Sequence, residues 1–287
     1  AMELQFSKQV RHSAALRAAY NALTQETYGF SFEPWYQAGY WGDAHVPYTL
    51  FDGGRAVSNV SVNRMELLLD GQARSCVQLG TVMTAPAYRG RGFSRRLMEA
   101  VLAEWAGETV FLFANESVLE FYPRFGFQKK AQVRFSMDLG RPRGRGRRLD
   151  MASAGDRELL LRHYKKTNPF SKIQTVNGEN LLMFYCAGPM AECVSYLPDF
   201  DAVAVAEAEG DVLHCYDVYC GAGQSLPDIL EALAPPGTRR VRLEFTPVDP
   251  APFETSPVPD EEDAMFVLND TGIFGWEPFL FPVISHT

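Results

Sequence analysis

The chain has few of the features that mark membrane, secreted or metal-binding proteins. No apolar run approaches the roughly 20 residues that a membrane-spanning helix needs, and the mixed, charged residues 6–11 do not form a signal-peptide pattern. The five cysteines form no C-x-x-C pair and lie away from clustered histidines, which argues against a zinc site and a disulfide framework. We therefore expect a cytoplasmic protein with reduced thiols, no metal and no membrane contact.

Positive charge is also scarce. The formal net charge is −8 at pH 7, which argues against a general nucleic-acid-binding protein. Residues 141–148, R-P-R-G-R-G-R-R, are the basic exception, and a nucleic-acid-binding arm is the functional alternative there. Proline, glycine and like charges instead favour a linker. The chain is 287 residues long and 46% hydrophobic, enough for two domains, and this linker predicts a boundary near residues 140–150.

The first half reads as a helix, a strand meander and a strand–helix–strand unit. Helical spacing of apolar residues predicts a helix within 13–27, and alternation predicts strands at 47–51, 55–69, 76–84, 110–114 and 131–139. A helix is predicted from Ser94, as N-cap, to residue 105, and a shorter one at 117–125. Because a helix connects strands 76–84 and 110–114, we expect these two strands to be parallel and 131–139 to be the last strand of the same sheet.

The stretch from Val82 to residue 96 is the strongest functional feature. A strand stops near Pro86, a turn with Gly90 and Gly92 follows, and a helix begins. The glycines allow close approach of the backbone to a ligand, and the start of a helix offers unpaired N–H groups and partial positive charge. Four neighbouring arginines add to that charge, so the turn predicts a phosphate or pyrophosphate site.

Residues 28–41 are unusually aromatic. The simpler interpretation is a helical segment that packs its rings on the sheet. The functional one is an aromatic groove for a cationic amine, because aromatic faces and carboxylates both attract ammonium groups. The candidate acceptor-binding residues in this stretch are Phe32, Glu33, Trp35 and Tyr36.

The second half repeats the order of the first. Residues 153–167 and 180–187 are predicted helices, and strands are expected at 202–208, 212–219, 241–245, 265–268 and 279–284, with a helix at 225–233. No basic, glycine-bearing helix start occurs at the matching place. We expect a second α/β domain with its own sheet and no cofactor of its own.

The central motif resembles the acetyl-CoA signature of the GCN5-related N-acetyltransferases, R/Q-x-x-G-x-G/A. Arg89 and Gly92 fit it, and Ser94 stands where glycine or alanine is usual. Residues 81–84 (T-V-M-T), the strand that ends before Asn115, and 121–127 (F-Y-P-R-F-G-F) fall at the family's spacing. The resemblance covers residues 10–140. Rival motifs fail, since a dinucleotide fingerprint needs glycine where Arg95 stands, and no phosphate-loop or nucleophile-elbow motif occurs.

The overall plan is similar to tandem acetyltransferases of the enhanced-intracellular-survival type, without their third, sterol-carrier-like domain. The resemblance implies an α/β fold of two related domains, each with a mixed, mostly antiparallel sheet, one parallel strand–helix–strand splay and flanking helices. It implies a catalytic, acetyl-CoA-binding domain at 1–140, a linker at 141–149 and a degenerate domain without cofactor at 150–287.

The reaction implied is direct transfer of an acetyl group from acetyl-CoA to an amine of a small cationic molecule or a peptide. Tyr122 is the implied general acid. The tandem relatives place a terminal carboxylate at the active site, which here is that of Thr287, and His286 is a second candidate base. Glu33, Glu116 and a chain of water molecules are further alternatives. The implied cofactor contacts are Val82, Met83, Thr84, Arg89, Gly90, Arg91, Gly92, Phe93, Ser94, Arg95 and Asn115.

Two alternatives use the same cleft. One is transfer of a different acyl group, such as succinyl. The other is a non-catalytic acyl-CoA sensor, which keeps the phosphate cradle and has no need of Tyr122.

Overall fold

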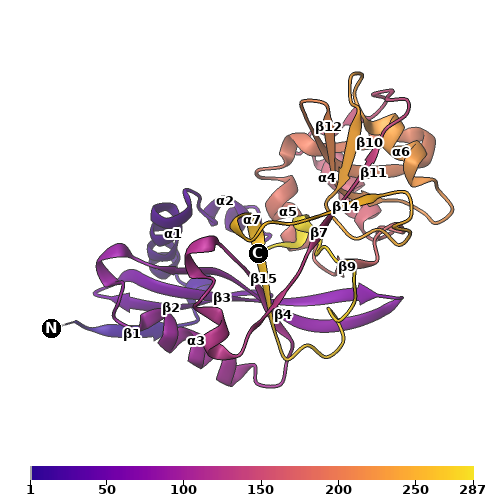
Figure 1. Cartoon of the computed structure of the whole chain (residues 1–287). Coiled ribbons are helices and arrows are strands. Elements are labelled where there is room, and N and C mark those ends of the chain that lie inside the picture. Colours follow the sequence, from indigo (N-terminus) through magenta and orange to yellow (C-terminus); the bar gives the residue numbers. More distant parts are fainter. Residues whose placement is uncertain (1) are drawn as a thin grey trace.

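The computed structural model describes residues 2–287 and folds them into two lobes, each built on one sheet (Figure 1). The first sheet has eight strands, and all neighbours in it are antiparallel except β4 and β5. In spatial order its strands are β1 (Leu4–Ser7), β2 (His45–Asp52), β3 (Arg55–Leu69), β4 (Gln72–Thr84), β5 (Val110–Ala114), β15 (Ala264–Leu268) and β6 (Gln128–Lys130), with β9 (Ile173–Val176) paired to β3.

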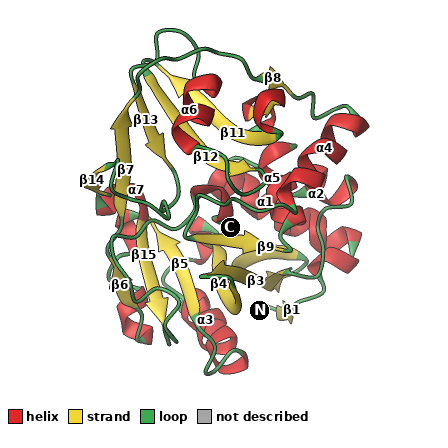
Figure 2. Cartoon of the chain, turned by 90° about the vertical axis from the view of Figure 1, so that its right-hand side faces the viewer, coloured by secondary structure: helices red, strands yellow, loops and turns green. Residues whose placement is uncertain are grey.

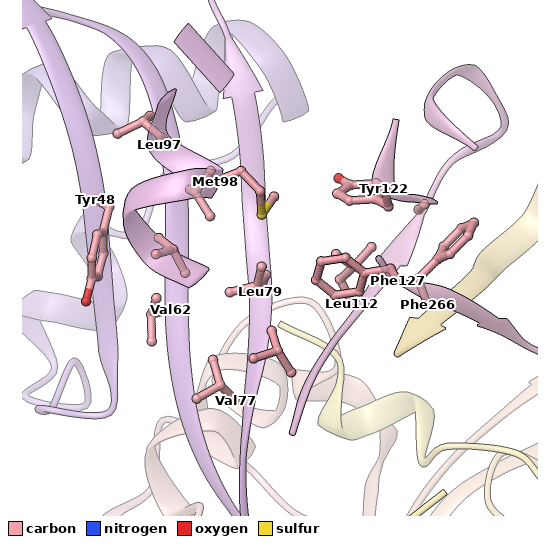
Figure 3. Packing of buried hydrophobic residues seen from close by; sticks show 14 of the residues in the cluster. Tyr48, Val62, Val77, Leu79, Leu97, Met98, Leu112, Tyr122, Phe127 and Phe266 are labelled. Carbon is pink, nitrogen blue, oxygen red and sulfur yellow. The ribbon is translucent and has the colours of Figure 1, made fainter. Parts of the chain in front are cut away.

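Helices cover both faces of this sheet. On one face α3 (Phe93–Glu104) buries Leu97, Met98 and Val101 against β3, β4 and β5 (Figure 3). On the other lie α1 (Ala14–Tyr28) and α2 (Glu33–Gln37). The face is set by the strand alternation, because Val77 and Leu79 join the α3 cluster while Gln78 points to the other side, where it bonds the main chain of Ser285.

The second sheet has seven strands and again one parallel pair, β12 with β13. Its order is β14 (Glu254–Pro257), β7 (Val133–Asp138), β13 (Arg240–Leu243), β12 (Val212–Tyr219), β11 (Ala202–Glu209), β10 (Val194–Leu197) and β8 (Arg147–Arg148). Helices α4 (Ala154–Tyr164), α5 (Glu179–Cys186), α6 (Leu226–Leu233) and α7 (Asp260–Asp263) complete this half. Within residues 2–287, no helix combines the length and the apolar character that crossing a bilayer would take.

The two halves exchange strands. The segment predicted as the first sheet's last strand forms β7 and pairs with β13 and β14 of the second sheet, so that prediction is wrong. In the opposite direction, β15 of the second half inserts between β5 and β6 of the first sheet, and β9 pairs antiparallel with the end of β3 (Figure 2). Alternation identifies a strand and its buried face, but it says nothing about which of two sheets offers the partner edge.

Several local predictions also need correction. The helix predicted from Ser94 starts at Phe93, with Gly92 in the N-cap position. The predicted helix 117–125 is instead two short 3-10 turns, Glu116–Val118 and Tyr122–Phe125; Pro123 lies at the start of the second turn and lacks the N–H that a continuous helix would need there. Residues 279–284 form no strand; they lead into a 3-10 turn, Val283–Ser285, and Phe279 and Phe281 pack in an aromatic cluster with Phe111 on the sheet.

The arginine-rich segment 141–148 is bound to the second lobe. Its arginines pair with acidic side chains, among them Arg143 with Glu231 at 3.2 Å and Arg148 with Glu192 at 2.9 Å. Residues 147 and 148 form β8 at the edge of the second sheet. These ion pairs give the positive charge partners within the chain, which disfavours the alternative of a nucleic-acid-binding arm.

Candidate active site

The parallel pair β4 and β5 opens into a cavity. The two strands pair only from Val77 with Val110 to Leu79 with Leu112, and beyond that point they diverge. A cavity of about 1250 Å³ begins there, lined by 79–84 of β4 and by 112–115 on the β5 side. The diverging strands leave the backbone of β4 without a ladder partner on this side, so an extended ligand arm can pair with it.

A bulge shapes β4 at the mouth of this cavity. The register with β3 shifts between Gly80, opposite Ser61, and Met83, opposite Asn59, and Thr81 takes a left-handed φ of 42°. Such a φ is strained for threonine, and it is held by Asn59 Nδ2, which donates to the Thr81 carbonyl at 2.9 Å. A bulge turns main-chain groups out of the ladder, which makes the N–H groups beside Val82 available to the cavity.

The glycine turn before α3 has the form expected of an anion site. Gly90 and Gly92 have φ values of 75° and 78°, and a Cβ on either would meet no atom within 4 Å. Helix α3 has no side-chain cap and no acidic residue in its first turn, so its free N–H groups are uncompensated. Arg89 lines the cavity next to this turn, and its Nε donates to the Thr84 carbonyl at 3.2 Å.

Not every residue of the expected cofactor set reaches the cavity. Those that line it are Val82, Met83, Thr84, Arg89, Ser94 and Asn115. Five others do not: Phe93 is buried in the core, Arg91 lies over the Tyr88 ring, Arg95 is near Glu99, and Gly90 and Gly92 form the turn itself. Their contribution to a ligand would come from main-chain N–H groups or from positive charge at the rim.

Tyr122 lies at the β5 side of the cavity. Its ring is 3% exposed and packs with Phe127 and Phe266, while its hydroxyl is turned away from both (Figure 3). Among residues 2–287 the hydroxyl has no hydrogen-bond partner. Burial raises the pKa of this phenol, so it stays protonated at neutral pH and remains able to donate.

The aromatic stretch divides into cavity wall and support. Phe32 and Trp35 line the cavity. Glu33 and Tyr36 do not, because Arg17 engages both: its Nε donates to Glu33 at 2.8 Å, and its guanidinium lies 3.7 Å from the Tyr36 ring centre. The hydrogen bond from Arg17 lowers the pKa of Glu33, so the carboxylate stays ionised and its charge is already paired with Arg17.

Thr287 lies inside the site, although it is far from β4 in sequence. Its N–H donates to Gln78 Oε1 at 2.8 Å, and its Oγ1 accepts from Asn63 Nδ2 at 3.0 Å. A Cβ on Gly80 would come within 2.6 Å of the Thr287 carbonyl oxygen. Glycine at position 80 therefore allows the main chains of Gly80 and Thr287 to pack this closely. Thr287 also lines a second cavity of about 370 Å³ on the side of β3 and β9.

His286 is placed differently from Thr287. It does not line the cavity, and its ring stacks on Phe113 with centroids 3.7 Å apart. Burial lowers its pKa to about 3, so the ring is neutral at physiological pH. Its Nδ1 lies 3.3 Å from Asp263 Oδ2.

Sequence reasoning missed several cavity residues. Tyr28 donates from its hydroxyl to the Val82 carbonyl at 2.9 Å, across the mouth of the cleft. His45 lines the same cavity, and Phe184, Tyr185 and Asp263 reach it from the second half of the chain. For Asp263, the sequence signal is the acidic run at 260–263. That run does not indicate a cavity residue by itself, because only the pairing of β15 with β5 brings it to the site. The region from 2 to 287 contains no group of side chains with the makings of a metal site.

The comparisons with known proteins agree with this geometry. Residues 11–129 match the family model described as an acetyltransferase (GNAT) domain. These residues form a GNAT domain. The chain is accordingly an acyltransferase, and the open parallel pair, the β4 bulge and the glycine turn all lie within the matched residues.

Solved GNAT structures extend the likeness over both lobes. A GCN5-related N-acetyltransferase from Kribbella flavida is 17% identical, with a TM-score of 0.58, over 92% of this chain and 71% of its own. Eis1 from Mycobacterium abscessus is 16% identical, with a TM-score of 0.56, over 92% and 73%. A GCN5-related N-acetyltransferase from Anabaena variabilis is 11% identical, at 0.58, over 92% and 72%. No curated protein matches the sequence significantly. The likeness supports the expected fold class, a mixed α/β fold with two mixed sheets.

Proposed function

We propose that the chain transfers an acetyl group from acetyl-CoA to the amine of a cationic small molecule or a peptide. The observation that carries this is the cavity between the diverging ends of β4 and β5, with the uncapped start of α3 and Arg89 beside it. In this proposal the N–H groups of the glycine turn and α3 bind the pyrophosphate. The free edge of β4 and the Asn115 amide bind the pantetheine arm.

The chemistry requires a donor for the developing oxyanion and two proton transfers. A main-chain N–H at Val82 or Met83, freed by the bulge, is the proposed oxyanion donor. Tyr122 is the proposed acid that protonates the departing thiolate. Its raised pKa weakens the driving force for that transfer but keeps the proton in place until the thiolate forms.

The proposed base is the carboxylate that Thr287 bears as the last residue of the printed sequence. Its support is position, since the Thr287 main chain lies in the cavity and is bonded by Gln78 and Asn63. His286 is less suited, because a ring whose pKa is lowered to about 3 accepts a proton poorly. Extending the chain by two glycines after Thr287 is expected to reduce turnover while leaving acetyl-CoA affinity unchanged.

The second lobe has a supporting part in this proposal. Residues 1–140 hold the cofactor and residues 150–287 hold none, but the latter supply walls of the acceptor side. All five cysteines are unpaired and buried, which supports a reducing, cytoplasmic location.

The test is release of free CoA thiol from acetyl-CoA in the presence of polyamines, aminoglycosides, alkylamines and peptides, with calorimetry for acetyl-CoA. Turnover with one acceptor class supports the proposal and names that class. Turnover with succinyl-CoA alone would replace acetyl by another acyl group. Tight acetyl-CoA binding with no release for any acceptor favours the sensor, and no binding overturns the cofactor site.

A further inference from the structure

The cavity carries charges of opposite sign on its two sides. The charged side chains that line it are Arg89, next to the start of α3 on the β4 side, and Glu262 and Asp263, on α7. Strand β15 pairs Ala264 with Ala114, so Asp263 comes next to Asn115 at the end of β5. An anionic acyl-CoA fits the first side, and the carboxylates fit a cation on the second.

Helix α7 reaches the site only through the strand exchange. Figure 1 draws α7, the C-terminal residues and α5 together where the two lobes meet. The chain passes from the second sheet through Asp260–Asp263 and enters the first sheet as β15. The second lobe therefore contributes an acidic side chain to a cavity whose cofactor side is built by the first.

Asp263 differs from Asp260 and Glu262 on the same helix in lacking a cationic partner. Asp260 pairs with Lys129 and Glu262 with Arg134, so their charges are compensated. Within residues 2–287, no lysine or arginine lies within ion-pair distance of Asp263. Its neighbour is the His286 ring, 3.3 Å away and neutral because of its burial.

The surroundings leave this carboxylate poorly solvated. Its side chain is 31% exposed, and burial raises the pKa of Asp263 to about 6. A partly buried carboxylate without a counter-ion is unfavourable, and a cation that binds beside it removes that penalty. Aromatic rings line the same cavity, among them Phe113, Tyr185 and Trp35, and their faces attract ammonium groups.

We propose that Asp263 selects acceptors that carry a second cationic group besides the amine to be acylated, by binding that group at the meeting of α7, α5 and β5. The inference rests on the proposed function for the reaction itself. It adds the substrate class: diamines and larger polycations rather than monoamines. Asp263 binds the acceptor in this scheme and takes no part in the proton transfers.

The test compares 1,4-diaminobutane with 1-aminobutane as acceptors for the wild type and for Asp263→Asn. We expect the wild type to favour the diamine by about 10-fold or more in kcat/KM, because the second ammonium would form a hydrogen bond to the charged Asp263 and such bonds typically contribute this much. Asp263→Asn should lose this preference by raising the KM for the diamine, with the monoamine unchanged. Glu261→Gln is the matched control, because it removes a charge from the exposed side of the same helix.

The pH dependence gives a second readout. The groups that face Asp263 are His286, Tyr185 on α5, Glu262 on the same helix, Glu116 on the 3-10 turn Glu116–Val118, and the end of the chain at Thr287. His286 and Tyr185 stay neutral between pH 5 and 8. The KM for the diamine is therefore expected to fall as pH rises through about 6 in the wild type and to be flat in Asp263→Asn.

The outcomes separate this inference from the proposed function. Equal use of both amines by the wild type, or a preference that survives in Asp263→Asn, overturns the role of Asp263 and leaves the transferase intact. Calorimetric binding of the diamine that is lost in Asp263→Asn, without any thiol release, supports the cation site and overturns the transferase. Removal of the charge should not prevent folding, which thermal unfolding of Asp263→Asn checks.

Discussion

The two sheets contain the same parallel strand–helix–strand unit, and in the part of the chain that the structure describes the cavity of about 1250 Å³ lies at the unit of the first sheet. In the first, β4 and β5 diverge around empty space. In the second, β12 and β13 pair over four residues and the space beyond is filled by the chain itself: Asn168 bonds Asp217 of β12, and Lys172 N–H donates to the Thr246 carbonyl after β13 at 2.8 Å. The fold provides the divergence, and the segment between the strands decides whether a ligand can use it.

The helices that follow these strands differ in the same sense. Helix α3 starts at Gly92 with no capping side chain and with arginines nearby. Helix α6 starts with Ser225, whose side chain caps the Asp228 N–H, and Asp228 places a carboxylate in the first turn. An external anion would be stabilised at the start of the first helix, whereas at the second the chain's own groups already fill that role.

The largest expected effect on acetyl-CoA affinity comes from Gly92→Val. The side chain would project where the pyrophosphate is proposed to lie, and losing one or two charge-assisted hydrogen bonds weakens acetyl-CoA binding by about 10- to 100-fold or more. Gly223→Val is the matched control, because Gly223 has a φ of 88°, open space around its Cβ and a place just before α6. Both changes should cost about 1–2 kcal/mol of stability. Equal acetyl-CoA affinity in the two variants, by calorimetry, would contradict the phosphate assignment.

Tyr122→Phe is expected to act on turnover alone. No thiolate is expected to form in the closed second site, so a general acid is needed only in the first. Loss of a general acid lowers kcat by about 10²–10⁴-fold. Acetyl-CoA affinity and melting temperature should change little, because the ring packing with Phe127 and Phe266 is kept. Steady-state thiol release checks this, and an unchanged kcat would assign the acid to another group or to water.

Asp217→Asn tests, through the pH dependence of folding stability, whether the second site is closed around Asp217. Burial raises the pKa of Asp217 to about 6, so protonation favours the folded state. That contribution is fully present below the unfolded pKa near 4 and is lost as pH rises through 6. The free energy of unfolding in urea is measured for the wild type and for Asp217→Asn. The wild-type value minus the variant value should therefore fall between pH 4 and 7 by on the order of 1–3 kcal/mol. A difference that does not vary with pH would mean that Asp217 is solvated.

The smallest effect is expected at the start of α6. Ser225→Ala removes the cap and should cost about 1 kcal/mol of stability, measured by urea unfolding. Acetyl-CoA stoichiometry should stay at one per chain, because residues 168–172 still bond to β12 and to the chain after β13, beyond the paired residues. A second bound acetyl-CoA would show that capping alone keeps that site closed.

Local patterns were enough to predict the secondary structure around the proposed cofactor site. The glycine turn, the helix start and the two parallel strands lie within one stretch of about 40 residues, so their mutual placement follows from short-range geometry and the handedness of the connection. The roles of individual residues such as Ser94 and Asn115 remain predictions, although both line the cavity. The exact helix start was misplaced because glycine and serine are both acceptable at an N-cap.

The acceptor side was decided by tertiary structure. Alternation marked β7 and β15 as strands in advance, but their exchange between sheets depends on which edges are free once the two lobes are packed. That exchange brings Asp263 to the end of β5, and the segment that follows β15 brings Thr287 against Gly80. The sequence by itself determined the glycine turn and helix start where phosphate binding is proposed, because that feature is a local backbone conformation. Only the folded chain decided which carboxylates face the cavity, because they come from segments more than a hundred residues away.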